Sequence, residues 1–222
     1  MDLVIVGTSH IAKESVREVT HRIEKEAPDI IALELDKGRL HALLHPKQQK
    51  SRMRDIRHVG LKGWMFAQLG SWAEKKLGRH VGVSPGQDML TAFRIAREQK
   101  IPIALVDQDI TITLKRFSQT LTWRERARFV IDIVSGVLKR KDFGFDLRTV
   151  PSEKVIAQLI GRVRKHYPNV YKVLVVERND VMARNLAMLM KLNPGKKILA
   201  VVGAGHEREL EALVQKYLTK TI

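Results

Sequence analysis

The 222-residue sequence contains no cysteine, and this absence narrows the chemistry that the chain can carry out. Without cysteine the chain forms no disulfide bond and offers no thiolate ligand. Any metal ion that this protein binds must therefore be held by imidazole nitrogens and carboxylate oxygens. The absence leaves the cellular compartment open.

Aromatic residues are scarce, and long apolar runs are missing. Only 5% of the chain is aromatic, which disfavours binding of nucleic acid by base stacking. No apolar run reaches the roughly 18 residues that a membrane-spanning helix requires. A strand-like pattern begins at residue 3, which leaves no room for a signal peptide before it. We expect a soluble domain that is cytoplasmic or associated with a membrane.

Acidic residues are outnumbered, because 40 lysines and arginines face 24 aspartates and glutamates, for a net charge of +16. The basic residues concentrate in residues 47–79 and 124–148. Such a surface can bind nucleic acid, attract an anionic membrane surface, or solvate a group of helices. Because no nucleic-acid-binding motif accompanies the charge, we consider nucleic acid the least favoured of these partners.

Stretches rich in glycine, serine and proline are also missing, which favours one domain over residues 1–222. Short β-branched apolar runs alternate with amphipathic helical patterns, and this alternation predicts an α/β fold with a central, mainly parallel sheet flanked by helices. A helical insertion is expected at about residues 110–165. The predicted strands are 3–6, 30–33, 102–106 and 198–202, and the predicted helices are 11–27, 37–44, 64–76, 88–99, 122–140, 155–163, 170–190 and 207–218.

Two matching tetrapeptides follow the first and the last predicted strands. Residues 7–10 read Gly-Thr-Ser-His and residues 203–206 read Gly-Ala-Gly-His. Each histidine would lie in a loop between a strand and a helix, and in a parallel sheet such loops share one edge. His10 and His206 would then meet in one pocket. A weaker interpretation is that each glycine only permits a tight turn and each histidine caps a helix.

Acidic residues follow two further strands, Glu34 after the second and Asp107 and Asp109 after the third. Imidazole and carboxylate together suit zinc, manganese or cobalt with open positions for water or substrate. We therefore predict that His10, His206 and Glu34 bind a divalent metal ion, with general base as the alternative role of Glu34. The predicted chemistry is metal-assisted hydrolysis.

Arg39 lies five residues after Glu34, on the first turns of the predicted helix that follows. From there its guanidinium would stabilise an oxyanion or bind a substrate carboxylate. The alternative is an ordinary ion pair between Arg39 and Glu34 near a helix N-terminus. Asp107 and Asp109 have a similar alternative, in which they cap the turn before residues 111–117.

Taken together, these segments resemble the TraB/PrgY family, which is related to the Tiki and GumN-like group. The resemblance covers most of the chain. It implies an α/β hydrolase-like fold, distantly similar to erythromycin-esterase-like enzymes, and metal-dependent peptidase activity on a peptide or small-molecule substrate. The matching segments, in order, are residues 7–10, 14–16, 28–29, 34–35 with Arg39, 83–86, 88–89, 107–113 with Leu114 and Arg116, 177–178, 182–183 and 203–206.

The resemblance also implies roles for individual residues. Arg178 would join Arg39 in stabilising charge. The residues that would bind substrate are Ser9, Asp107, Asp109, Arg116 and Glu177.

Two positions depart from the family pattern, which has Asp-Arg-Asp after the third strand and Glu-Arg-Asp in the long helix. This chain has Gln108 and Asn179 in place of the arginine and the second acid. If those two residues normally pair, the neutral amides keep a hydrogen bond between them and remove a charge pair. If either one takes part in catalysis, the chain would bind a ligand and turn it over poorly.

Two questions of function and assembly remain open at the level of sequence. The alternative to an enzyme is a non-catalytic module that binds a peptide or an anion at a membrane surface or with a partner protein. An apolar stripe formed by Phe129, Ile133 and Val137 predicts a homodimer, unless it packs on residues 64–69 or on membrane helices of a longer protein. Many members of the family carry such helices, so this chain is either the soluble part of a longer protein or a short form.

Overall fold

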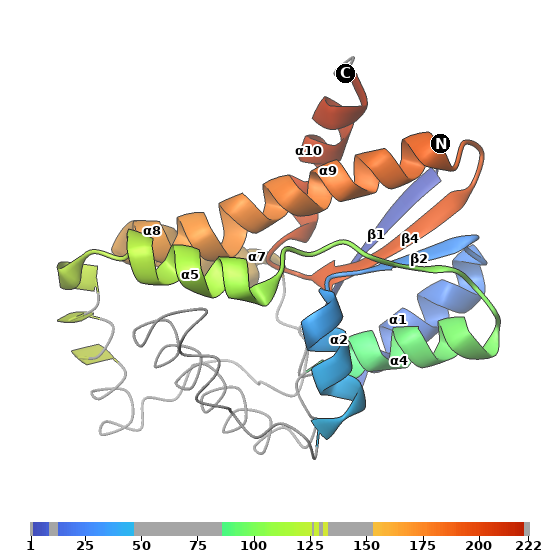
Figure 1. Cartoon of the computed structure of the whole chain (residues 1–222), viewed down its shortest axis with the longest axis horizontal. Coiled ribbons are helices and arrows are strands. Elements are labelled where there is room, and N and C mark those ends of the chain that lie inside the picture. The colour runs from blue at the N-terminus through green and yellow to red at the C-terminus, as the bar shows by residue number, and fades with distance from the viewer. Residues whose placement is uncertain are drawn as a thin grey trace.

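The computed structural model describes residues 2–8, 13–46, 86–125, 127–128, 131–132 and 153–219. In this part of the chain four strands form one sheet in the order β1-β4-β2-β3, and every pair is parallel (Figure 1). The predicted α/β fold with a mainly parallel sheet is confirmed. The strands are β1 (Asp2–Thr8), β2 (Ile30–Leu33), β3 (Ile103–Leu105) and β4 (Lys197–Gly203).

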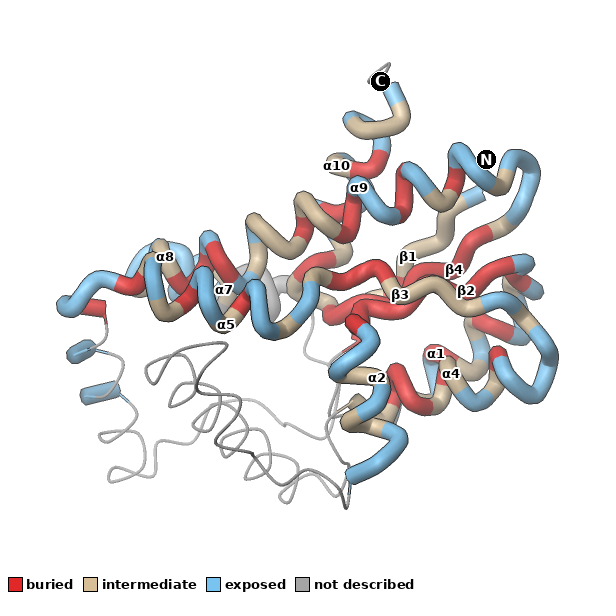
Figure 2. The backbone as a smooth tube through the Cα atoms, viewed as in Figure 1, coloured by how far each residue is buried: buried red, intermediate tan, exposed pale blue. Residues whose placement is uncertain are grey.

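Helices cover both faces of the sheet, and the two inner strands are buried between them (Figure 2). Alternate residues of β2 point to opposite faces, so Ile30 packs in one core cluster and Ile31 in the other. Burial on both sides explains why the inner strands read as unbroken apolar runs. One face carries α9 (Glu177–Leu192) and α10 (Glu207–Thr219), and the other carries α1 (Lys13–Glu26) and α4 (Gln87–Glu98).

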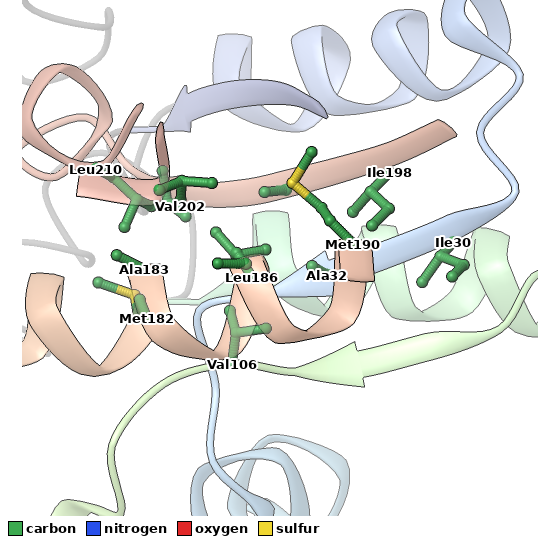
Figure 3. Packing of buried hydrophobic residues seen from close by; sticks show 13 residues of the cluster. Ile30, Ala32, Val106, Met182, Ala183, Leu186, Met190, Ile198, Val202 and Leu210 are labelled. Carbon is green, nitrogen blue, oxygen red and sulfur yellow. The ribbon is translucent and has the colours of Figure 1, made fainter. Parts of the chain in front are cut away.

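The α9 side of the core shows how spacing in the sequence becomes packing. Met182, Leu186 and Met190 recur every four residues and point from α9 onto Ile198 and Val202 of β4 (Figure 3). All five side chains are at most 3% exposed. Burying a side chain of this size stabilises the fold by roughly 1.5–3 kcal/mol, so this face fixes α9 on the sheet.

Two helices begin at aspartates that follow strands. Asp36 caps α2 (Lys37–Leu44), because its Oδ1 accepts hydrogen bonds from the backbone of Gly38 at 2.7 Å and Arg39 at 3.0 Å. Asp109 caps α5 (Ile110–Thr120) and accepts from the backbone of Thr111 at 2.7 Å. Both caps fix the course of the chain at the carboxyl edge of the sheet.

The long helix predicted at residues 170–190 is present but is not regular. It begins with α8 (Pro168–Tyr171), continues as a π-helical segment labelled η2 (Lys172–Val176), and then becomes α9. The wider turn changes the direction in which the following side chains point, and such turns are frequent at functional sites. In this chain the π-helical segment directly precedes Glu177.

The segment predicted as a helical insertion contains α5 and α7 (Glu153–His166). A small cluster formed by Phe117, Leu121, Val170 and Val173 joins α5 to α8 and η2. Several predicted features lie outside the described residues: the helix at 64–76, the whole of the basic segment 47–79, and the stripe residues 129, 133 and 137. Within the described parts of the chain, no helix has the length and apolar character needed to cross a membrane.

Candidate functional site

The carboxyl ends of all four strands lie along one edge of the sheet. The register pairs Thr8 of β1 with Gly203 of β4, and Leu33 of β2 with Val201 of β4 and Leu105 of β3. The residues that follow each strand therefore enter a common region, which is the position where ligands bind in parallel α/β proteins.

The two Gly-x-x-His segments are joined directly by their backbones. The N–H of Ala204 donates to the carbonyl of Thr8 at 2.8 Å. A Cβ atom added at Gly7 would overlap the carboxylate of Glu207 and would lie 3.1 Å from the Cα of Ala204, so a larger residue at position 7 would force its neighbours to move. The close approach of the two loops therefore favours glycine at the start of the first segment.

Arg178 occupies the centre of this edge and contacts both strand-end carboxylates. Its Nη2 donates to Oε1 of Glu34 and, at 2.8 Å, to Oδ2 of Asp107, while its Nε donates to Oδ1 of Asp107 at 3.0 Å. Burial alone lowers the pKa of Arg178, but the charges of Glu34 and Asp107 outweigh burial and raise the pKa above its ordinary value. Arg178 is therefore a fixed cation.

Glu34 is buried, and each of its carboxylate oxygens has a defined environment. Its Oε2 accepts a hydrogen bond from the backbone N–H of Gly203 at 2.5 Å. Its Oε1 accepts from Arg178 and lies 3.4 Å from Nε2 of His206. The backbone of the second Gly-x-x-His segment thus positions the carboxylate that faces the histidine of that same segment.

His206 is 7% exposed, and its other ring nitrogen is also engaged. Nδ1 lies 2.6 Å from Oδ1 of Asn179, which is completely buried. Nδ2 of Asn179 donates to Oε2 of Glu209 at 3.0 Å, and the hydroxyl of Tyr171 donates to Oε1 of Glu209 at 2.7 Å. These four residues form a continuous chain of hydrogen bonds that ends at Nδ1 of His206.

Arg39 reaches the same edge from α2. Its Nη1 donates to Oδ2 of Asp107 at 2.6 Å, so Asp107 binds two arginines. The side chain of Arg39 is 36% exposed, whereas that of Asp107 is only 1% exposed. Part of the Arg39 side chain therefore remains accessible. The alternative pairing of Arg39 with Glu34 is not the one observed, since the ion pair that Arg39 forms is with Asp107.

Comparison with known proteins identifies the family. Residues 2–215 match the family model described as the TraB/PrgY/gumN family. The chain belongs to this family. It is 33% identical to an uncharacterized protein of Methanocaldococcus jannaschii over 99% of this chain and 54% of that protein. It is 25% identical to a human TraB domain-containing protein over 93% of this chain and 61% of that protein. The chain thus spans a little over half the length of these relatives.

The remaining substrate-binding candidates of this TraB-family chain lie in different places. Arg116 and Glu177 bind each other through two hydrogen bonds, at 3.1 and 2.6 Å, which join α5 to the first turn of α9. The hydrogen bond from Arg116 lowers the pKa of Glu177. Asp109 is exposed and caps α5, as in the alternative interpretation. Ser9 and His10 lie outside the described residues.

The two departures from the TraB-family pattern do not pair with each other. Gln108 donates to the hydroxyl of Thr113 at 3.0 Å, whereas Asn179 contacts His206 and Glu209. In this chain the two amides therefore keep no hydrogen bond with each other, because α9 presents Asn179 toward α10 while Gln108 begins the loop toward α5.

The donor set at this edge suits a metal ion in part. Two ligands that each lie about 2.1 Å from one tetrahedral ion are about 3.4 Å apart, which is the separation of Glu34 Oε1 and His206 Nε2. No group of three or more histidines, cysteines, aspartates or glutamates in the described residues is arranged to hold an ion. A third protein ligand would have to come from elsewhere, and His10, two residues after Thr8 in the sequence, lies outside the described residues.

Proposed function

We propose that this TraB-family chain is a metal-dependent, peptidase-like hydrolase in which His206, Glu34 and His10 hold a zinc, manganese or cobalt ion. The observation that supports the proposal is the Glu34–His206 pair, whose facing atoms are 3.4 Å apart at the carboxyl edge of the sheet. A bound divalent ion would supply a water with a pKa near neutrality and would polarise the scissile carbonyl.

The residues of the chain have separate tasks in this proposal. His206 offers Nε2, and Glu34 offers Oε1 in an orientation fixed by the backbone N–H of Gly203. Arg178 balances the charge of Glu34 and Asp107, so that two buried carboxylates are tolerated at one edge. Arg39, which is held by Asp107 and is partly exposed, stabilises a developing oxyanion or binds a substrate carboxylate.

A second function is favoured by the arginines themselves. Asp107 is saturated by Arg39 and Arg178, and the exposed part of Arg39 is a site for an anionic group. In that case the chain would bind a peptide or another anionic ligand without turning it over. Its basic region would then act at an anionic membrane surface or with a partner protein.

Metal analysis and peptide hydrolysis distinguish these functions. We expect the purified chain to take up about one zinc, manganese or cobalt ion per chain by calorimetry, and to hydrolyse members of a peptide library analysed by mass spectrometry. A chelator should abolish hydrolysis, and one of the three metals should restore it. His206→Ala should lose both properties, whereas His21→Ala, which changes an exposed histidine on α1, should keep them. Peptide binding without metal uptake or hydrolysis would support the second function and contradict the first.

A further inference from the structure

We infer that Tyr171, Glu209 and Asn179 are positioning residues that hold His206 as one neutral tautomer, with its proton on Nδ1 and the lone pair of Nε2 directed at Glu34 and Arg178. The inference starts from Glu209. An ionised carboxylate only accepts hydrogen bonds, so the Asn179 atom that faces it at 3.0 Å must be the amide nitrogen. The hydroxyl of Tyr171 occupies the other oxygen of Glu209 at 2.7 Å.

The orientation of Asn179 then determines which ring nitrogen of His206 carries the proton. With its nitrogen turned toward Glu209, Asn179 presents its oxygen to Nδ1 of His206 at 2.6 Å. A carbonyl oxygen accepts and does not donate, so Nδ1 must carry the hydrogen. In a neutral imidazole the second nitrogen then has the lone pair.

The contact of Nε2 with Arg178, on the other side of the His206 ring, also bears on the tautomer. Nη1 of Arg178 lies 3.3 Å from Nε2 of His206, and a guanidinium nitrogen is always a donor. This donor at Nε2 fits a proton on Nδ1, although Oε1 of Glu34, an acceptor, also faces Nε2 at 3.4 Å. The much shorter contact of Nδ1 with the Asn179 oxygen, at 2.6 Å, therefore decides where a neutral ring carries its proton.

Burial makes this arrangement hard to reverse. Asn179 is 0% exposed and both ends of its amide are hydrogen-bonded, so turning the amide would place its NH₂ group against His206 and its oxygen against the carboxylate of Glu209. Burial raises the pKa of Tyr171, as does its hydrogen bond to Glu209, and the phenol therefore remains a donor.

The arrangement determines the chemical character of Nε2 of His206. Asn179 sets the position of the proton without placing a negative charge against the ring, so Nε2 is kept as a neutral nitrogen donor. This step deepens the proposed function, because Nε2 is the atom that would bind the metal ion. The tautomer itself is a property of the chain without metal or substrate.

The first test is long-range ¹H–¹⁵N NMR of the full chain, labelled with ¹⁵N, treated with a chelator and measured at alkaline pH. His206→Gln identifies the His206 signals by their loss. We expect a protonated, pyrrole-type Nδ1 and an unprotonated, pyridine-type Nε2. A proton on Nε2 in the unmodified chain would overturn the inference whatever the outcome of the metal and peptidase experiments. A confirmed Nδ1 proton together with no metal uptake would leave the inference intact and contradict only the proposed function.

Variants test which residues hold the tautomer. Asn179→Leu removes the acceptor at Nδ1, and the proton should move to Nε2, where Oε1 of Glu34 accepts it. Glu209→Gln disturbs the buried core less, and should give a mixture of tautomers, because a glutamine side chain can present either its oxygen or its nitrogen to Asn179. An unchanged single Nδ1 tautomer in both variants would overturn the positioning role.

Asn185→Leu is the matched control. Asn185 lies on the same helix as Asn179, but its Nδ2 donates to the carbonyl of Val106 at 2.9 Å and not to His206 or Glu209. This variant also removes one asparagine hydrogen bond from α9, so it reports any general effect of loosening the helix. The His206 signals should be those of the unmodified chain, and a tautomer change in Asn185→Leu as large as in Asn179→Leu would contradict a specific role for Asn179.

Discussion

Asp107 binds Arg178 through two parallel hydrogen bonds, from Nε at 3.0 Å and from Nη2 at 2.8 Å. The second residue after β3 is thereby fixed to the first turn of α9, and the same carboxylate also holds Arg39 of α2 at 2.6 Å. A buried carboxylate with two cationic partners is costly to disturb, because the partners are left in a poorly solvated environment.

We therefore expect Asp107→Asn to lower the free energy of unfolding by about 3–5 kcal/mol, because it breaks a buried ion-pair network from one side. Urea denaturation followed by circular dichroism measures the change. Asp29→Asn is the control, since Asp29 also binds two groups, the side chain of Lys196 and the backbone of Lys197, but at an exposed position. Equal losses in the two variants would contradict the importance of burial at Asp107.

Arg178 gives a prediction about metal affinity. Its guanidinium donates to Oε1 of Glu34, the same oxygen that is proposed to bind the ion, so the two cations would oppose each other. Arg178→Gln should therefore bind manganese more tightly, by about tenfold or more, and should lose hydrolysis. Calorimetry measures the affinity. Arg116→Gln, which removes the neighbouring arginine paired with Glu177, should leave it unchanged. Weaker binding in Arg178→Gln would place the ion elsewhere.

The meeting of strand-end residues could be predicted from the sequence because it depends on local patterns. Each strand is a short apolar run, and the rule that parallel strands share a carboxyl edge brings Glu34, Asp107 and His206 together. The cap at Asp36 and the start of α2 follow from the same local chemistry. These features require no knowledge of how the helices pack.

The centre of the site could not be predicted from spacing in the same way. Arg178 lies more than 140 residues from Glu34, and its direction depends on a π-helical segment that no periodicity indicated. The contact of Asn179 with His206 depends on how α9 packs against α10. Resemblance to a family marked Asn179 as unusual, but only the structure relates it to Glu209. A polar residue three positions after His206, on the first turn of the following helix, was the available signal.

The free energy of unfolding at acidic pH should depend on Glu125. Burial alone raises the pKa of Glu125, but hydrogen bonds from Asn169 and Thr122 outweigh burial and lower the pKa below 4.5. The folded state therefore binds this proton less readily than the unfolded state does. The resulting stabilisation is present above pH 4.5, and it is lost as the pH falls through the lowered pKa of Glu125. Glu125→Gln should reduce the steepness of this loss. Unfolding free energies measured from neutral pH to below pH 4.5 test it, and an unchanged slope would contradict it.

Self-association provides the last prediction. The apolar stripe proposed to form a homodimer lies outside the described residues, but two side chains beside it in sequence are described. Trp123 is 73% exposed and Ile131 is 63% exposed, which is unusual for residues of this size and leaves apolar surface for a partner. A two-fold dimer would bury both copies of such a surface.

We expect light scattering at moderate salt to give a dimer in the micromolar range, and Ile131→Asp to shift it toward monomer, since a buried interfacial charge without a partner is strongly unfavourable. Met188→Asp is the matched control, because Met188 is 62% exposed on α9, in a different part of the fold. A monomer at every concentration would exclude the homodimer. Dissociation caused equally by both substitutions would contradict an interface that depends specifically on the apolar surface at Trp123 and Ile131.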